Sequence, residues 1–527
     1  MQRGLKHLRR AWDFYRISFI KRSVFYRFSL SRKHTIFDTA RFITDPWAGD
    51  SRVGRAILDS SSYVHAGNET PTDILDSITG KSHENVRYAA SFAWIRDLQA
   101  LGGNSSRKYV RNLISLFIAR YRRKRRFYID HDTWSYTIIG ERIVNWMFSY
   151  SFFASGSNDK FQREVLSSIA EQFSHLVKCY KEELNPYSRL MALKAILFCL
   201  CSMKTPHKYK IQRTLDEICE IIEENTDEGG MFGMRSPVDH FHIFRSLIEI
   251  RFIARNFGLD LPSSVFTETI SKMALVIRFL RLGDGSISQH SGTLTNDNSV
   301  FVPSRYMVDT ALSVVEIKTY KIKPYGFDRL ETKKATIIVN TESCNSRSKF
   351  NNFSEPGINV FDFETSFGDK KLINRADISV VVNNFRIKLN EKAKSFARKG
   401  AKDTYVFFEG EARFSSKFFE FTMKREITIF SDRQRVDCAD SLRISENADV
   451  SIRIVFNRYT DIKEVGKRSV LLGLGKAEYI FSCTASDADD FWTIHVPNSS
   501  NYPTIEIISS LSGHKEIKFE WSVEFIK

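Results

Sequence analysis

One histidine of the chain stands in a setting that suits proton transfer. His290 lies in the stretch GDGSISQHSG (283–292), after an amphipathic segment that Gly283 and Gly285 bring to an end. Histidine changes its charge near neutral pH, so a polar histidine beside a glycine-rich turn is a candidate general acid or base. The alternative is a turn histidine that only hydrogen-bonds a backbone carbonyl.

A second group of candidate residues lies in WSYTIIGERIVNWM (134–147). Arg142 and Trp146 are four residues apart and therefore share one face of a helix. Together with Trp134 and Asn145 they form a candidate sugar subsite, because aromatic faces stack on pyranose rings. Core packing is the alternative for Trp146.

Two more histidines occur in DHFHIF (239–244). His240 and His242 are two residues apart, so they point to different faces of a helix and do not both line one site. We take His240 as the candidate for substrate binding and expect one of the pair to be structural. The seven cysteines form no CxxC pair, which argues against a zinc ribbon or a full disulfide framework.

The elements that must position these residues change character along the 527 residues. Near the end of the first half, Phe266, Ile270 and Met273 recur with helical spacing. The spacing predicts helices over about 84–101, 106–120, 135–153, 161–180, 187–203, 212–224, 240–257 and 263–283. After about residue 330 the period becomes two, as in EIKFEWSVEF (516–525), which predicts antiparallel strands with one wet face. Helices and strands that segregate in this way predict separate domains.

Charge is concentrated at the start of the chain. Residues 1–42 hold 11 Lys and Arg against Asp13 and Asp38, whereas the whole chain has a net charge of +16. This basic segment is a candidate for peripheral contact with an anionic membrane or another polyanion, and a solvated docking helix is the alternative. No apolar run reaches the ~20 residues of a membrane span, and we find no convincing signal peptide.

The order of these segments resembles the bacterial heparinase II/III family, polysaccharide lyases with an α/α toroid and a β-sandwich. The resemblance runs from about residue 40 to the end and rests on DPWAGDSRVGRAIL (45–58), FAWIRDLQALGG (92–103), WSYTIIGERIVNWM, EGGMFGMRSP (228–237), IRFLRLGDGSISQHSG (277–292), FDFETSFGDKKLINRAD (361–377) and KDTYVFFEGEARFSSKFFEFTMKREITI (402–429). It implies an α+β multidomain protein, an N-terminal incomplete α/α toroid followed by a C-terminal antiparallel β-sandwich. The expected divisions are a basic segment 1–42, a toroid 43–320 and a sandwich 321–527.

Several positions depart from the family pattern. Arg235 and Ser236 stand where the family has an Arg-Asn-Pro loop, and a Ser donor has a shorter reach than Asn. Tyr405 is retained in a sandwich loop that lacks its usual histidine, while Phe327 and Asn457 replace an expected tyrosine and histidine. The sandwich histidines that hold zinc in some relatives have no counterparts, so we predict no metal and no other cofactor.

The resemblance implies cleavage of a uronic-acid-containing anionic polysaccharide by β-elimination. His290, Tyr405, Arg235 and Ser236 are then the candidate catalytic residues, because the reaction needs a base, an acid and a group that neutralises the substrate carboxylate. The alternatives are a degenerate relative that binds glycan without cleaving it, or a membrane- or polyanion-associated scaffold. We expect no nucleic acid partner. The resemblance implies a cell-envelope or periplasmic location, with the cytoplasm as the alternative.

Overall fold

The fold is taken from a computed structural model of the chain. It describes residues 26, 29–30, 34–59, 74, 86–123, 131–233, 236–262, 264–290, 305–317, 324, 326–341, 360–382, 385–386, 394–415, 420–485, 492–497, 502–511 and 516–527. Most of the basic segment 1–42, and Arg235, lie outside these residues.

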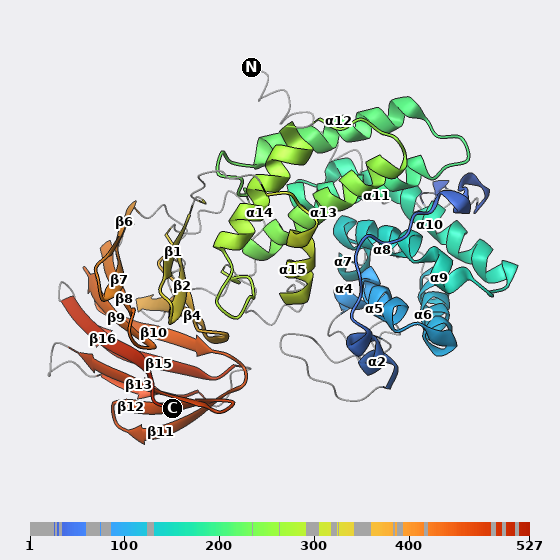
Figure 1. Cartoon of the computed structure of the whole chain (residues 1–527). Coiled ribbons are helices and arrows are strands. Elements are labelled where there is room, and N and C mark those ends of the chain that lie inside the picture. The colour runs from blue at the N-terminus through green and yellow to red at the C-terminus, as the bar shows by residue number, and fades with distance from the viewer. Residues whose placement is uncertain are drawn as a thin grey trace, which may run out of the picture.

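Helices fill the first part of the chain and lie to one side of the strands (Figure 1). The α-helices of the described part are α2 (Ser51–Asp59), α4 (Val86–Ser91), α5 (Ile95–Leu101), α6 (Gly103–Arg123), α7 (His131–Trp134), α8 (Tyr136–Phe148), α9 (Tyr150–Ala154), α10 (Asp159–Cys179), α11 (Pro186–Cys201), α12 (Lys208–Asn225), α13 (Pro237–Asn256), α14 (Ile270–Phe279) and α15 (Arg305–Ser313). Short 3-10 helices are η2 (His34–Ile36), η3 (Thr39–Arg41) and η5 (Tyr180–Glu182), and η6 (Ser264–Thr269) is a π-helical turn that leads into α14. None of the described helices is long and apolar enough to cross a bilayer.

Local sequence explains where the central helices begin and break. Both α11 and α13 start with a proline directly after a capping side chain, Asn185 or Ser236, because proline lacks the N–H that a first helical residue leaves unpaired. The predicted helix 84–101 is instead two helices. Phe92 separates them with a left-handed backbone (φ 58°) while its ring is fully buried against Trp94 and Trp146.

The second part of the chain is built from antiparallel strands. They are β1 (Phe327–Glu331), β2 (Ala335–Asn340), β3 (Phe363–Phe367), β4 (Lys370–Val382), β5 (Phe385–Arg386), β6 (Lys394–Ala401), β7 (Tyr405–Ser415), β8 (Glu420–Phe430), β9 (Arg435–Ile444), β10 (Ala448–Phe456), β11 (Thr460–Gly466), β12 (Ser469–Leu474), β13 (Ala477–Ala485), β14 (Trp492–His495), β15 (Thr504–Leu511) and β16 (Glu516–Phe525). Within the described residues they form two eight-stranded sheets. The first runs β1-β2-β3-β4-β10-β15-β14 with β5 beside β4, and the second runs β11-β12-β13-β16-β9-β8-β7-β6.

The two sheets pack face to face around one apolar core. In β16 the buried residues Ile517, Phe519, Trp521 and Val523 alternate with more exposed polar ones, as the period of two predicts. An ion pair lies within this core, because Arg425 of β8 meets Asp440 of β9 at 2.5 Å with both side chains fully buried. Helices followed by a two-sheet sandwich confirm the predicted fold class. The last described helix ends at Ser313 and the first strand begins at Phe327, and the division at residue 320 stays a prediction.

Candidate functional site

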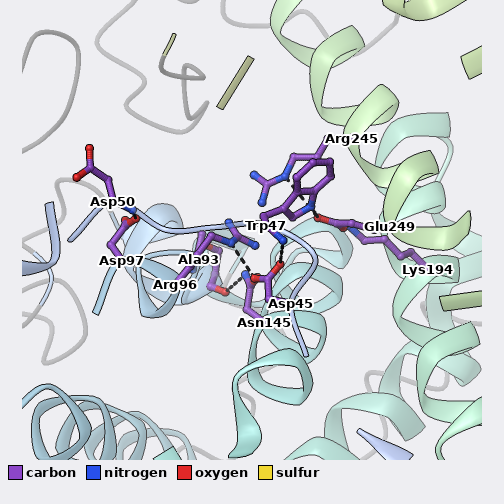
Figure 2. A network of polar contacts seen from close by, with 11 residues as sticks. Asp45, Trp47, Asp50, Ala93, Arg96, Asp97, Asn145, Lys194, Arg245 and Glu249 are labelled. Carbon is purple, nitrogen blue, oxygen red and sulfur yellow. Dashed lines mark hydrogen bonds and ion pairs between the residues drawn. The ribbon is translucent and has the colours of Figure 1, made fainter. Parts of the chain in front are cut away.

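A cluster of charged and polar side chains lies where the segment after residue 44 meets α5, α8, α11 and α13 (Figure 2). We call it the polar cluster. Figure 2 labels its members Asp45, Trp47, Arg96, Asn145, Lys194, Arg245 and Glu249. Its other members are Glu141, Tyr187 and Asp239, which interact with it electrostatically. Its members come from five segments spread over more than 200 positions of the chain.

The segment 45–54 closes one side of the polar cluster. Asp45 pairs with Arg96 of α5 at 2.7 Å, and the Trp47 indole N–H donates to Glu249 of α13 at 2.7 Å. Glycine is required at two points of this segment. A Cβ on Gly49 would stand 2.1 Å from the Arg96 carbonyl oxygen, and one on Gly54 would stand 2.3 Å from that of Asp97. These contacts explain the spacing of charged, aromatic and glycine residues in DPWAGDSRVG.

Glu249 is the anionic centre of the polar cluster. Its carboxylate lies 2.5 Å from Lys194 Nζ and 3.5 Å from Arg245 Nε, and the Arg245 guanidinium stacks over the Trp47 ring at 5.2 Å. Burial raises the pKa of Glu249, but the charges of Lys194 and Arg245 outweigh burial and lower it to about 2. Glu249 is therefore a permanent anion that holds two cations in place.

One face of α8 presents a polar stripe to this region. Thr137, Glu141 and Asn145 recur every four residues and keep partial solvent contact, whereas the other described positions of the helix are buried. Asn145 donates to the Ser91 carbonyl at 2.9 Å. Burial and the nearby Glu249 charge raise the pKa of Glu141, against the opposing effect of Lys194.

Two titratable residues with raised pKa values lie in the first turns of neighbouring helices, α11 and α13. Tyr187 is the second residue of α11 and Asp239 the third of α13, and both keep partial solvent contact. Burial raises the pKa of Asp239 to about 6, against a hydrogen bond with Ser236 that lowers it. Burial and the charges of Glu141 and Asp239 raise the pKa of Tyr187 well above 10. Near neutral pH these two neighbouring helices offer a carboxylate base and a neutral phenol.

The cations Arg96 and Arg245 complete the polar cluster. Their side chains are 11% and 13% exposed, so they are shielded from bulk water without being closed off from it. Burial lowers the pKa of Arg245 to about 10, whereas the carboxylates of Asp45 and Glu249 overcome burial and raise the pKa of Arg96. Both guanidinium groups are suited to bind a carboxylate.

The residues predicted at 134–146 divide between the core and the polar cluster. Asn145 belongs to the cluster, whereas Arg142 and Trp146 are fully buried on another face of α8. Arg142 donates to Gln172 at 2.7 Å and to the Ala90 and Thr133 carbonyls at 2.9 Å. This burial favours core packing for Arg142 and Trp146, and their role in a sugar subsite stays a prediction.

Trp134 lies away from the polar cluster. It is 6% exposed and lines a separate small cavity of about 190 Å³ together with Tyr121, Arg122 and Glu171. Its predicted part in substrate binding also stays a prediction.

His240 and Ser236 hold the start of α13. The buried His240 ring accepts from the Phe232 N–H at its Nδ1 and faces the Met273 carbonyl with its Nε2, both at 3.3 Å. Burial lowers the pKa of His240 to about 4, so the ring is neutral. Ser236 caps the helix by accepting from the Asp239 N–H at 3.2 Å. These contacts favour structural roles, and the predicted roles in binding and catalysis stay predictions.

Two of the predicted catalytic residues, His290 and Tyr405, contact different sheets. His290 is 4% exposed and contacts Ile338 of β2 in the first sheet, at 3.0 Å from Nε2 to the carbonyl oxygen. Tyr405 begins β7 of the second sheet, where its half-buried ring lies near Phe407, Phe430 and the Lys402 ammonium. Their catalytic roles stay predictions, as does that of Arg235. Within the described residues no group of His, Cys, Asp and Glu is arranged to hold a metal ion.

Sequence reasoning missed Tyr187, Asp239, Arg96 and Arg245. A signal was present, because NPY (185–187) and SPVD (236–239) both combine a capping residue with a first-turn proline. Two such helix starts that each carry an acid–base residue predict a shared surface once the helices pack side by side. Only the fold brings that surface together.

The comparisons with known proteins agree with this architecture. No family model matches the sequence, and no curated protein matches it. Among solved structures, the crystal structure of heparinase III is similar at 13% identity, covering 92% of this chain and 87% of that chain, with a TM-score of 0.57. A mutant of the heparan sulfate lyase HepC from Pedobacter heparinus matches at 12% identity over 92% of this chain and 85% of that chain, with a TM-score of 0.49. The match to heparinase III shows that this chain has the same toroid-and-sandwich fold.

Proposed function

We propose that the protein is a polysaccharide lyase that cleaves a uronic-acid-containing anionic polysaccharide by β-elimination, with the polar cluster as its reacting centre. The heparinase III fold supports the class of protein. The observation that carries the proposal is the pair Asp239 and Tyr187, whose environments favour an ionised carboxylate and a neutral phenol at the same pH.

Asp239 is the base of the proposed reaction. The proton to be removed is on the carbon next to the uronate carboxylate, and removing it adds negative charge to an anion. A base whose pKa lies near the working pH combines sufficient strength with the right protonation state, and a pKa of about 6 satisfies both.

Tyr187 is the acid of the proposed reaction. As Asp239 takes the proton, the electron pair of the C–H bond forms a carbon–carbon double bond and the glycosidic C–O bond breaks. The Tyr187 hydroxyl gives its proton to the departing oxygen, and the cycle closes when solvent returns a proton to Tyr187 and removes one from Asp239. A phenol with a pKa well above 10 remains protonated for this task over the whole neutral range.

The substrate carboxylate needs a cationic partner throughout the reaction. We assign this role to Arg245, since it belongs to the polar cluster and keeps 13% of its side chain exposed. Arg96 and Asn145 supply further donors from α5 and α8. Such donors stabilise the charge that builds up as the proton leaves.

The residues taken from the family resemblance give a competing assignment. In that version His290 or Tyr405 moves the proton, and Arg235 with Ser236 holds the carboxylate. We also propose a cell-envelope or periplasmic location, which rests on the family resemblance as well.

The activity is tested by incubating the protein with a panel of uronic-acid polysaccharides and following ultraviolet absorbance. β-Elimination leaves a double bond conjugated to a carboxylate, so the product absorbs without any coupling reagent. We expect Tyr187→Phe to lower the rate roughly 100- to 10,000-fold, while Tyr405→Phe stays close to the wild type. The reverse pattern would move the reacting centre to the sandwich.

A second candidate function is glycan binding without cleavage. One observation favours it over cleavage. Arg96 and Lys194 already pair with protein carboxylates at 2.7 and 2.5 Å, so they are less able to neutralise the charge that develops on a reacting substrate. Saturable binding of a polysaccharide with no rise in absorbance on any substrate would support this function over the lyase.

A further inference from the structure

The turn that follows α14 docks on the first sheet. The Gly283 N–H donates to Ser366 Oγ at 2.7 Å, and the Gln289 N–H donates to Glu364 of β3. From β1, Arg329 donates to the Phe279 carbonyl at 3.0 Å and so satisfies the end of α14. A small apolar core, formed by Met231, Val276, Leu280, Leu282, Phe327 and Ile338, seals this junction between helices and strands.

His290 lies within this junction between two acceptor atoms. Its Nδ1 is 3.3 Å from Asp362 Oδ1, and its Nε2 is 3.0 Å from the Ile338 carbonyl oxygen. A carbonyl oxygen and an ionised carboxylate accept hydrogen bonds and never donate them. A proton on each ring nitrogen would therefore face an acceptor atom on either side, which favours the charged imidazolium form.

We infer that His290 is a proton-dependent lock that joins the helical part of the chain to the first sheet. The protonated ring, 4% exposed, forms an ion pair with Asp362 ahead of β3 and donates to the main chain of β2 at once. Loss of the proton removes the charge that pairs with the Asp362 carboxylate, which is itself 1% exposed.

The charged groups around His290 favour its protonated form. Asp362 lies beside it, and Glu364 of β3 adds a second negative charge that Lys371 of β4 partly balances at 2.5 Å. Phe327 of β1 covers the ring, with centroids 5.6 Å apart. Burial alone would lower the pKa of His290, but Asp362 and Glu364 outweigh it and raise that pKa above its usual 6.5.

The direction of the pH dependence follows from this raised pKa. A histidine with a higher pKa in the folded chain contributes its full stabilisation below its unfolded pKa. That stabilisation is lost as the pH rises through the folded value. The junction is therefore tightest below about pH 6.5 and loosens as the pH rises through the folded pKa of His290, whether or not the protein is a lyase.

Amide hydrogen exchange on the full-length protein tests the lock. Protection factors, which remove the intrinsic pH dependence of exchange, are compared over about pH 5 to 9 for peptides of 279–290 and of β8 and β9. We expect protection in 279–290 to fall roughly tenfold or more above the His290 pKa, while β8 and β9 keep theirs. Uniform protection of 279–290 across the range in the wild type would overturn the inference without recourse to any variant.

Three variants test whether His290 causes the pH-dependent loss of protection in 279–290. His290→Gln can still donate to the Ile338 carbonyl but cannot be charged. In this variant the protection factors of 279–290 should therefore not change with pH. Asp362→Asn should move the midpoint down by about one pH unit or more, because the attracting charge is gone. His207→Gln changes an exposed histidine at the start of α12 and should match the wild type. An unchanged midpoint in Asp362→Asn would contradict the lock.

Discussion

The Trp47 indole N–H donates to Glu249 Oε1 at 2.7 Å, joining residues that are 202 positions apart. This bond connects the segment before α2 to α13 and fixes the carboxylate that also holds Lys194 and Arg245 (Figure 2). Because Glu249 is almost completely buried, it organises the polar cluster through electrostatics that water does not screen.

Removing the charge of Glu249 should strongly destabilise the helical part of the chain. Glu249→Gln leaves two shielded cations without their anion, and breaking a buried pair in this way costs roughly 3–5 kcal/mol. Chemical denaturation measures the loss in the free energy of unfolding. The matched control is Glu331→Gln, which removes an ion pair whose carboxylate is 57% exposed and should cost less than about 1 kcal/mol. Equal effects of the two changes would contradict a buried anionic centre.

Glu249 should also make stability depend on pH in acid. Its folded pKa of about 2 lies below the usual 4.5, so its stabilisation is present above pH 4.5 and is lost as the pH falls towards 2. Thermal unfolding followed from neutral to acidic pH should show this loss, and Glu249→Gln should show a shallower one. An identical slope in both proteins would argue that Glu249 is not ionised in the folded chain.

A methyl group at Gly49 should displace the segment that closes the polar cluster. In Gly49→Ala the new Cβ would overlap the Arg96 carbonyl oxygen, and overpacking of this kind costs roughly 1–3 kcal/mol or more. Gly466→Ala is the control, because its Cβ would meet no atom within 4 Å. The midpoints of urea unfolding compare the two, and a Gly49→Ala protein as stable as the control would show that the close approach is absent.

Replacing Arg245 should weaken productive binding of an anionic substrate. Arg245→Met keeps much of the side-chain volume but loses a charged donor, and we expect kcat/KM to fall roughly 10- to 100-fold. Arg398→Met, which alters a surface guanidinium with 64% exposure, should leave kcat/KM unchanged. Equal losses in the two variants would mean that net charge, and not the polar cluster, governs binding.

The acid side of the pH–rate profile should report Asp239. The base must be ionised, so kcat/KM should rise with pH and level off above a pKa of about 6. Tyr187 keeps its proton well beyond pH 10 and should cause no loss in the neutral range. An acid limb centred near pH 4 would point to an ordinary exposed carboxylate as the base.

The sequence was sufficient to predict the architecture because it is encoded by local periodicity. The alternation in β16 and the helical spacing through Phe266, Ile270 and Met273 each depend on neighbouring residues only. The break at Phe92 was not predictable in this way, since its left-handed backbone is held by a buried ring and by no turn residue.

The candidate site was predicted less well because spacing alone does not say which helix face is buried. Arg142 and Trp146 share a face, as expected, but that face points into the core, and the solvated stripe is the one through Glu141 and Asn145. Tyr187 and Asp239 are 52 positions apart. Each follows a capping residue and a first-turn proline, but that local pattern does not say that the two helix starts lie side by side. Their shared environment exists only after α11 and α13 have packed.

The most direct test of the account is the ultraviolet absorbance assay on Asp239→Asn beside the wild type, with polysaccharide binding measured in parallel. We predict that the wild type produces an absorbing unsaturated uronate, and that Asp239→Asn binds the same polysaccharide but loses roughly 100-fold or more of the rate. Full activity in Asp239→Asn, with binding unchanged, would contradict the polar cluster as the reacting centre.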